Sequence, residues 1–489
     1  MEIGKFIQRN NIFLILIAVL GISFFLRVYG LGTENIWPDE GLTMYNAHKS
    51  VSHNIEWSLS LAYFPLYHIL LSLWEKLFGL SEFSMRFLSV IFGTLSVYLV
   101  YRIGLLMFNK KIGLYSAIIM ALSSYNVYYS QEARVYMLFV LLTLLSVKFY
   151  IQYLQSAKNR DLAYYILSTL LVLNTHGPAI FILFFQNIHY ILFVRKGFKK
   201  WIFTQCLIFL SFLPLLFVVV SRMLELSQYL EMAKPGLPEL ARTFYTFSAG
   251  TTYEPTALVF GVALSLLFSI LAFLAVISMH KDIKNKDHAK ISNIAFLLLW
   301  LFVPMLLLVL QSYTFYSLYF DRYIIASSIA LYMLVAVAIS ALKNKFQSLA
   351  VLSIILLSLS ILTMDFGTLN KGRWKDAADY VHANKHKQDA VILSIQNVIY
   401  PFAYYSDSEC FKSINLAKCM SEQNVYSVKN ADELPPDIDK RSKVFLVLFN
   451  DKYIDSKGTL LKYFSSNYNL TEEKHYPYIK IFTFEKRKI

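Results

Sequence analysis

Long apolar runs are the feature that most constrains this chain. The runs at 12–28, 87–107, 258–279 and 291–310 are each long enough to cross a hydrocarbon core of about 30 Å. Charged residues make up only 16% of the 489 residues, against about 25% in ordinary soluble domains. Apolar runs of this length are buried as helices in a bilayer, so the sequence predicts a polytopic membrane protein.

The basic residues predict how the chain is oriented in the membrane. Short connections rich in Lys and Arg fall on one side if the spans alternate, and that side is the cytoplasm. This distribution explains the net charge of +14, so no nucleic-acid partner is expected. We predict an inner (plasma) membrane protein with a cytoplasmic N-terminus and about eleven spans, near 12–30, 83–108, 113–130, 134–155, 162–177, 178–194, 201–221, 257–279, 291–311, 322–341 and 347–364.

The C-terminal tail has a different pattern from the rest of the chain. "WKDAADYVHANK" has helical spacing, "DAVILSI" and "KVFLVLF" are typical of strands, and "YIKIFTFE" alternates. We therefore predict an all-α transmembrane domain over 1–364 and a small extracytoplasmic α/β domain over 365–489. Cys410 and Cys419 would lie where disulfides are permitted, and the sequence leaves open whether they form one.

The predicted first outer loop, 31–82, is long, apolar and aromatic. Its helical pattern is interrupted by Pro65, and the part that follows is too short and too charged for a comfortable span. Helices that lie on the membrane surface fit this pattern better than another crossing.

A small set of ionisable residues lies near membrane depth, where a charge is costly and marks a candidate functional site. The predicted topology puts all of them toward the outer side. Each also has a structural explanation, such as a solvated loop, a charge at a helix end or an arginine that reaches the interface, and composition does not decide. They are Asp39, Glu40, Arg86, Glu132, Arg134, His176, Asp321 and Arg322.

Several stretches resemble one known family of membrane enzymes. The stretches are "WPDEGLT", "SEFSMRFLS", "SSYNVYYSQEARVYMLFVLLTLL", "NTHGPAIFILFFQN", "DRYIIASSIALYMLVA" and "GRWKDAADYV". They are similar to glycosyltransferases of the GT-C fold, in the prokaryotic branch related to dolichyl-phosphate-mannose protein mannosyltransferases (glycosyltransferase family 39). The lipid A aminoarabinose transferase is a more distant relative of similar plan.

The resemblance implies a hexosyl- or pentosyltransferase of the cell envelope. Such an enzyme takes a sugar from a polyprenyl-phosphate donor and passes it to a lipid, glycan or protein hydroxyl on the outer face. The chain departs from the family at 63–67, where it reads Tyr-Phe-Pro-Leu-Tyr and many relatives have His-Pro-Pro-Leu-Tyr. A metal or phosphate role for that histidine therefore does not carry over.

The resemblance and the chemistry together assign roles to the candidates. Asp39 matches the family's acidic position in the first outer loop and is the expected base for the acceptor hydroxyl. One displacement by that oxygen would invert the anomeric centre. Glu40 and His176 are open as ligands of a divalent metal, and no other cofactor is expected. The candidates are Asp39, Glu40 and Glu132 for catalysis, Arg134, Arg322 and Arg86 for the donor phosphate, and Tyr67, Tyr129, Tyr136 and His176 for the substrate.

Two other classes of function compete with this interpretation. A transporter or lipid flippase would carry acids and bases deep within its spans and often an internal repeat, and neither is evident. A non-catalytic assembly or sensor protein would depend on its C-terminal tail. It would be indifferent to the loss of the Asp39 carboxylate.

Overall fold

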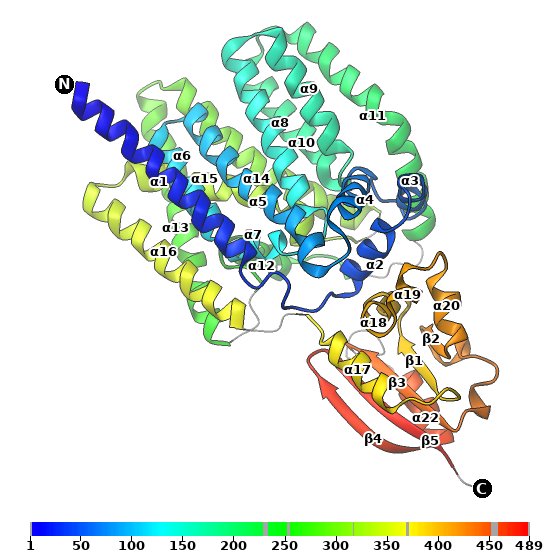
Figure 1. Ribbon diagram of the computed structural model, residues 1–489. Coiled ribbons are helices and arrows are strands. Elements are labelled where there is room, and N and C mark those ends of the chain that lie inside the picture. Colours follow the sequence, from blue (N-terminus) through cyan, green and yellow to red (C-terminus); the bar gives the residue numbers. More distant parts are fainter. Residues whose placement is uncertain are drawn as a thin grey trace. The chain divides into compact units, whose positions relative to one another are not determined.

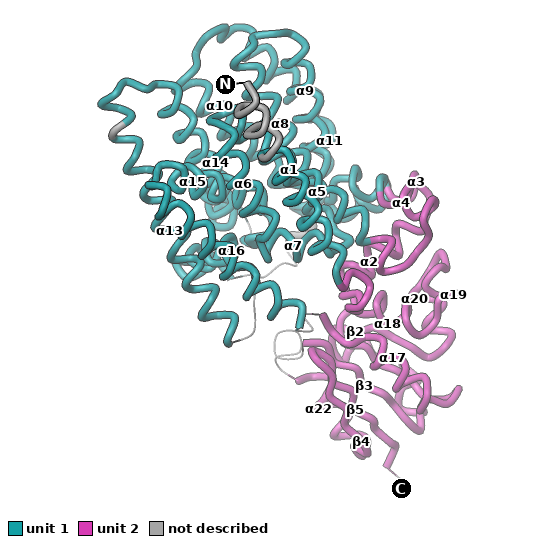
Figure 2. Tube along the Cα trace, turned by 60° about the vertical axis from the view of Figure 1, so that its left-hand side comes forward, with its two compact units in different colours: residues 1–29, 55–70, 86–368 teal, residues 30–54, 71–85, 369–489 magenta. Residues whose placement is uncertain are grey.

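The computed structural model describes residues 2–227, 233–251, 255–315, 317–367, 371–450 and 458–487. The chain forms two compact units, shown in Figure 2. Unit 1 consists of residues 1–29, 55–70 and 86–368, and unit 2 consists of residues 30–54, 71–85 and 369–489. The segment predicted as the first outer loop therefore contributes to both units.

Unit 1 is helical, and its helices follow the apolar runs (Figure 1). Each of the eleven predicted spans contains helix. Breaks occur at polar or proline-containing points, such as the Ser123 cap between α6 and α7. The helices are α1 (Glu2–Val28), α5 (Glu82–Met107), α6 (Lys110–Leu122), α7 (Ser124–Ser130), α8 (Tyr136–Ser156), α9 (Asn159–Leu173), α10 (Phe181–His189), α11 (Phe198–Ser227), α12 (Leu237–Ala249), α13 (Pro255–Lys284), α14 (His288–Thr314), α15 (Ser327–Ala341) and α16 (Asn344–Gly367), with the short turns η1 (Gly177–Ile180), η2 (Tyr190–Val194) and η3 (Asp321–Ile324).

Seven helical segments of the described chain are long and apolar enough to cross a membrane. They are 82–107, 136–156, 177–194, 198–225, 256–284, 288–314 and 344–367, and 12–28 and 327–341 are shorter apolar helices. The remaining two predicted spans correspond to α6 with α7 and to α9. The chain is a mostly helical, multi-pass membrane protein.

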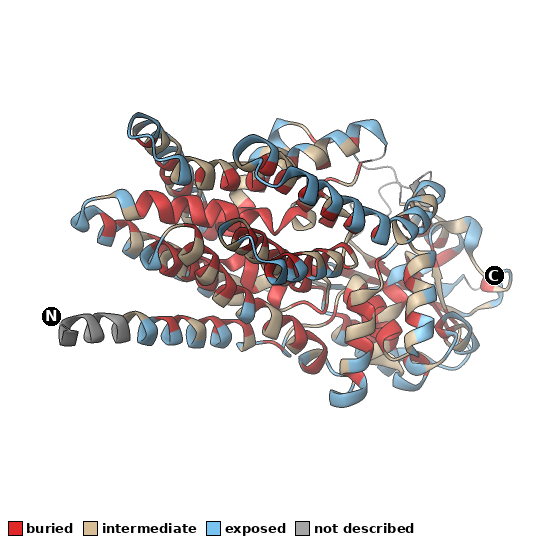
Figure 3. Cartoon of the chain, turned by 90° about the horizontal axis from the view of Figure 1, so that it is seen from above, coloured by how far each residue is buried: buried red, intermediate tan, exposed pale blue. Residues whose placement is uncertain are grey.

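The interior of unit 1 is built around helices that are buried on every side. α15 is buried continuously from Ser327 to Ile339, and Figure 3 shows such buried stretches among helices with exposed outer faces. Exposed leucines and phenylalanines on the outer helices, such as α11 and α13, suit contact with lipid. At one crossing, a Cβ on Gly104 would lie 2.6 Å from the Cα of Gly113, so α5 and α6 touch through their backbones.

The first outer loop folds into three helices, α2 (Pro38–Ala47), α3 (Val51–Ser60) and α4 (Leu66–Phe78). The break between α3 and α4 contains Ala62, which has a positive φ of 58°, and Pro65. α4 exposes Leu77 and Phe78, at 76% and 58%. An apolar exposed face agrees with the predicted surface helix, and its placement on the membrane stays a prediction.

The C-terminal part of unit 2 is an α/β fold around one mixed sheet. The strands are β1 (Ala390–Ser394), β2 (Val425–Val428), β3 (Lys443–Phe449), β4 (Tyr468–Tyr476) and β5 (Ile479–Lys486), in the order β2-β1-β3-β5-β4. β1 pairs in parallel with β2 and β3, and β5 runs antiparallel to β3 and β4. The helix and three strands predicted for the tail are confirmed. The helices here are α17 (Trp374–Asn384), α18 (Ile399–Ser406), α19 (Ser408–Lys412), α20 (Leu416–Glu422) and α22 (Thr459–Asn467).

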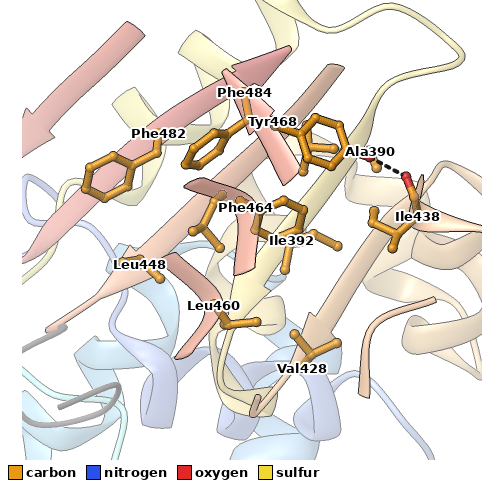
Figure 4. Packing of buried hydrophobic residues seen from close by; sticks show 12 residues of the cluster. Ala390, Ile392, Val428, Ile438, Leu448, Leu460, Phe464, Tyr468, Phe482 and Phe484 are labelled. Carbon is orange, nitrogen blue, oxygen red and sulfur yellow. Dashed lines mark hydrogen bonds between the residues drawn. The ribbon is translucent and has the colours of Figure 1, made fainter. Parts of the chain in front are cut away.

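Aromatic side chains fill the core between the sheet and α22 (Figure 4). Phe464 of α22 packs against Tyr468 and Phe484, with ring centroids 5.7 and 5.6 Å apart. The Tyr468 hydroxyl donates a hydrogen bond of 2.7 Å to the carbonyl of Ile438. A buried tyrosine hydroxyl needs such a partner, and this hydrogen bond offsets the cost of burying the Tyr468 hydroxyl beside the apolar core.

A disulfide closes the segment between α19 and α20. Cys410 and Cys419 are bonded, with their Cα atoms 5.5 Å apart. Carbonyls within this closed segment accept hydrogen bonds from Tyr45 on α2, 3.1 Å to Ser413 and 2.9 Å to Ile414. Lys49 also donates to Ser413. The disulfide segment therefore holds the end of α2, far away along the chain.

Candidate active site

The turn between α7 and α8 carries two of the predicted charges in unit 1. Glu132 is 1% exposed and Arg134 is half-buried. Tyr129 and Tyr136 flank the turn, with ring centroids 4.9 Å apart in an edge-to-face arrangement. Charges with so little exposure to solvent are costly in a membrane protein and are retained where they bind or react.

His176 and Arg322 come from distant parts of the chain to the same place. His176 lies in the turn before η1, and its ring is 6.1 Å from Tyr136 and 4.9 Å from Tyr323. The guanidinium of Arg322 lies 4.1 Å from the centre of the Phe320 ring. Arg134 and Arg322 both act electrostatically on His176. Four of the predicted site residues thus gather in unit 1: Arg134, Tyr136, His176 and Arg322.

Two histidines beside these arginines are held neutral. Burial, together with the charges of Arg134 and Arg322, lowers the pKa of His176 to about 3. Burial and the charge of Arg134 lower the pKa of His68 to about 3 as well. Nε2 of His176 and Nδ1 of His68 are buried and have no hydrogen-bond partner among the described residues. Both rings can therefore serve as neutral hydrogen-bonding groups toward a bound molecule.

The remaining predicted residues of unit 1 are also buried. Tyr67 is 1% exposed and packs beside His68, with ring centroids 5.7 Å apart. Arg86 is 2% exposed and lies one turn into α5. Tyr129 is within electrostatic reach of Asp321, Arg322 and Glu132. The predicted residues of unit 1 thus include three guanidinium groups, those of Arg86, Arg134 and Arg322, against the two carboxylates of Glu132 and Asp321, and this excess of positive charge can bind an anion.

Asp39 and Glu40 belong to unit 2, in the first turn of α2. Pro38 stands at the start of this helix, where its missing N–H costs nothing, and the acids follow where the helix dipole favours negative charge. Glu40 is fully buried and forms an ion pair of 2.9 Å with Lys371, which is buried as well. Asp39 is half-buried, and its carbonyl accepts a hydrogen bond of 2.8 Å from Thr43. The two neighbouring acids therefore have different surroundings.

Close packing fixes α2 within unit 2. A Cβ on Gly41 would lie 2.9 Å from Cβ of Tyr400 and 3.0 Å from the backbone N of Pro401, so only glycine fits against α18. Tyr45 and Tyr400 also pack together, with ring centroids 5.4 Å apart. The helix that carries Asp39 is thus held by its glycine, its buried ion pair and the disulfide segment.

No group of three or more His, Cys, Asp and Glu side chains within the described residues could hold a metal ion. Glu40, one of the two side chains open as a metal ligand, is instead paired with Lys371. The surroundings of His176 contain two arginines, which would repel a cation.

Sequence reasoning missed Lys371, His68 and Arg27. Arg27 of α1 is fully buried and donates to Ser130 at 3.1 Å and to the carbonyls of Ala121 and Met120 at 3.2 Å. It therefore satisfies carbonyls at the end of α6 and joins three helices of unit 1. Arg27 and His68 both lie in apolar stretches. An ionisable residue in such a stretch marks a candidate functional site, so both could have been identified from the sequence.

Part of the chain is similar to a known protein family. Residues 64–223 match the family model described as dolichyl-phosphate-mannose-protein mannosyltransferase. Among curated protein sequences, none matches the chain.

Solved structures of similar fold cover nearly the whole chain. One is ArnT from Cupriavidus metallidurans in the apo state, with a TM-score of 0.61 and 12% identity over 97% of this chain and 98% of ArnT. The same ArnT bound to undecaprenyl phosphate gives a TM-score of 0.55 at 12% identity, over 96% of this chain and 97% of ArnT. The oligosaccharyltransferase of Archaeoglobus fulgidus tethered to an acceptor peptide gives 0.56 at 14% identity, over 96% of this chain and 74% of that one.

Proposed function

We propose that this protein is a membrane glycosyltransferase that transfers a sugar from a polyprenyl-phosphate donor to an acceptor hydroxyl. The match of residues 64–223 to the family model described as dolichyl-phosphate-mannose-protein mannosyltransferase supports this proposal. The acceptor is a lipid, a glycan or a protein. The observation that carries the proposal is the placement of two arginines near His176. The Arg322 guanidinium lies 5.6 Å from the ring of Tyr323, which is 4.9 Å from the His176 ring, and Arg134 and Arg322 both act electrostatically on His176. Two guanidinium groups near one point form a binding site for an anion such as a phosphate.

The donor chemistry fits this charge distribution. When the bond from the anomeric carbon to the phosphate oxygen breaks, its electron pair leaves with the lipid phosphate, which is stable as an anion. Arg134 and Arg322 stabilise the added negative charge. Arg86 is a third candidate, since it is buried in the same unit. The neutral rings of His68 and His176, with Tyr67, Tyr129 and Tyr136, supply hydrogen bonds and ring faces for the sugar and the phosphate.

The acceptor needs a base, and we assign that role to Asp39. Its carboxylate takes the proton of the acceptor hydroxyl while the oxygen attacks the anomeric carbon opposite the phosphate, which inverts that centre. Asp39 is half-buried, whereas Glu40 is buried and paired with Lys371, so Asp39 is the acid that remains more accessible. We accordingly propose that Glu40 positions α2 through Lys371. We propose Glu132, which is buried in unit 1 within electrostatic reach of Tyr129, as a further carboxylate of the catalytic set.

The proposed orientation of the chain in the membrane rests on the positive-inside rule. We propose that the reaction takes place on the outer face of the membrane, with the N-terminus in the cytoplasm and the C-terminal sheet outside. The disulfide in unit 2 supports this placement, because such bonds persist in oxidising compartments.

The test is transfer of a radiolabelled sugar from a polyprenyl-phosphate donor by the full chain in lipid nanodiscs. Asp39→Asn should lower turnover by about 10²–10⁴, the contribution of a positioned base. Asp432→Asn, at an exposed position of unit 2, serves as the matched control and should transfer at the wild-type rate. Near wild-type turnover by Asp39→Asn would exclude the base assignment.

The phosphate assignment has its own pair of variants. Arg134→Lys and Arg322→Lys keep the charge and lose the fork of donors, and each should cost about 1.5–3 kcal/mol of donor binding. Arg160→Lys, 69% exposed at its side chain, is the control. If both arginine variants bind the donor as tightly as the wild type, the phosphate does not bind there.

A further inference from the structure

Unit 2 contains a cavity that none of the assigned roles uses. Its volume is about 520 Å³, and every residue that lines it belongs to unit 2. Pockets for small molecules span about 300–1,000 Å³, so the space is sufficient for a ligand of that size. The lining comes from the chain before α2, the start of α5, and helices α17, α18 and α19.

One wall of the cavity is a preorganised polar cluster. The hydroxyls of Tyr404 and Tyr405 donate to the two carboxylate oxygens of Glu82, at 2.9 and 3.1 Å. The Tyr405 hydroxyl also accepts a hydrogen bond of 2.9 Å from the backbone N–H of Ile36. A carboxylate offers about four acceptor positions, so Glu82 keeps capacity for a ligand hydroxyl while its orientation stays fixed.

Aromatic rings form the apolar part of the lining. Tyr404 packs edge-to-face against Tyr405 at 5.0 Å and against Phe411 at 5.2 Å between ring centroids. These perpendicular rings are locked by one another and by Glu82, so little side-chain entropy is lost when a ligand binds. A sugar ring has an apolar face of C–H groups and an edge of hydroxyls, and it matches a site that combines ring surfaces with fixed hydrogen-bonding groups.

The charges on the lining balance. Glu34 and Glu82 are opposed by Lys375 and Lys412. A phosphate or another strongly anionic ligand would call for an excess of cations. A balanced set of donors and acceptors instead favours a neutral ligand that carries hydroxyl groups.

We propose that this cavity binds a neutral hexopyranose unit, as a subsite for the sugar of a glycan or glycolipid acceptor. The choice of an acceptor sugar rests on the proposed transferase activity. The ligand chemistry itself rests on the cavity, its aromatic rings and its balanced charges. The proposal narrows the acceptor from any hydroxyl compound to one that carries at least one sugar ring.

The experiment measures binding of the methyl glycosides of glucose, galactose and mannose to the full chain in nanodiscs, by saturation-transfer NMR. Ser408 lines the cavity at the exposed first position of α19, so Ser408→Trp fills the space without disturbing the core. Ser466→Trp, at an exposed position of α22 outside the cavity, is the matched control. Tyr404→Phe is a second variant, which removes one hydroxyl and keeps the ring.

The inference predicts that at least one glycoside binds the wild type. Ser408→Trp should weaken that binding at least about tenfold, a loss of about 1.4 kcal/mol, and Ser466→Trp should leave it unchanged. Absence of binding by all three glycosides, or equal binding by Ser408→Trp and the wild type, would overturn it. Transfer from the polyprenyl-phosphate donor is measured on the same preparation. Transfer without glycoside binding would refute the subsite alone, and binding without transfer would refute the proposed function alone.

Discussion

The buried ion pair of Glu40 and Lys371 allows a test of whether Glu40 positions α2 and stabilises unit 2. The two side chains are 2.9 Å apart and 0% and 3% exposed. At that distance and an effective dielectric constant of about 20, two unit charges attract by about 6 kcal/mol. Removing one partner leaves the other charged and buried, so we expect Lys371→Met to destabilise unit 2 by about 3–5 kcal/mol.

The double variant Glu40→Leu with Lys371→Met should recover most of this loss, because no charge is left buried. Hydrogen exchange of the α17 and β1 amides measures the free energy of opening of unit 2 directly. The exposed pair Arg373–Asp376 is the matched control, with side chains 47% and 34% exposed. Asp376→Asn should cost no more than about 1 kcal/mol.

Two results would refute this reasoning. The first is a coupling energy between Glu40 and Lys371 below about 0.5 kcal/mol, the error expected for independent sites. The second concerns transfer activity. If the double variant regains stability and remains inactive, Glu40 takes part in the chemistry rather than in positioning α2.

Four further predictions follow from packing and charge. Gly41→Ala should cost unit 2 about 1–3 kcal/mol by overpacking, and unchanged hydrogen exchange would contradict the fit against α18. Arg27→Lys should lower the thermal midpoint, because an ammonium cannot reproduce the donor fork toward α6, and an unchanged midpoint would contradict that role. Cys410→Ser should cost unit 2 about 3 kcal/mol, and a reductant should reproduce the effect only in the wild type. The folded pKa of His68, about 3, lies below its unfolded value of about 6.5. The unfolded state therefore binds more protons between those values, and stability rises with pH across that window. His68→Gln should flatten this dependence between pH 5 and 7, and an equally steep dependence would contradict it.

The helices of unit 1 were predictable because the signal is local. A run of apolar residues must form helix in a bilayer whatever its neighbours are, since its backbone groups have no other partners. Two strands of unit 2 were missed for the opposite reason. β2 has four residues, and β4 lies at the edge of the sheet with most of its side chains exposed, so neither carries an apolar pattern of useful length.

The residues of the candidate site were predictable only where a charged or polar residue interrupts an apolar stretch of sequence. Arg134, His176 and Arg322 are conspicuous because they interrupt apolar sequence, and unit 1 brings them together. Lys371 follows the last span in a polar stretch, where a lysine attracts no attention. Its partner, Glu40, lies 331 positions away along the chain, so the sequence gives no local sign of the ion pair. Residue type alone does not distinguish Asp39 from Glu40, whereas a helix turns about 100° per residue and buries only one of them fully.

Unit 2 is built from three separate segments of the chain, and this limits when it can fold during synthesis. Residues 30–54 and 71–85 leave the ribosome before residues 369–489, which complete their unit. Until then Glu40 has no Lys371, Gly41 has no α18, and the disulfide segment that holds Tyr45 does not exist. A nascent or truncated chain would therefore lack a settled α2, and Asp39 would acquire its fixed position only in the finished molecule. A chain that lacks residues 369–489 is therefore expected to lack a fixed Asp39, the base that we propose for the transfer.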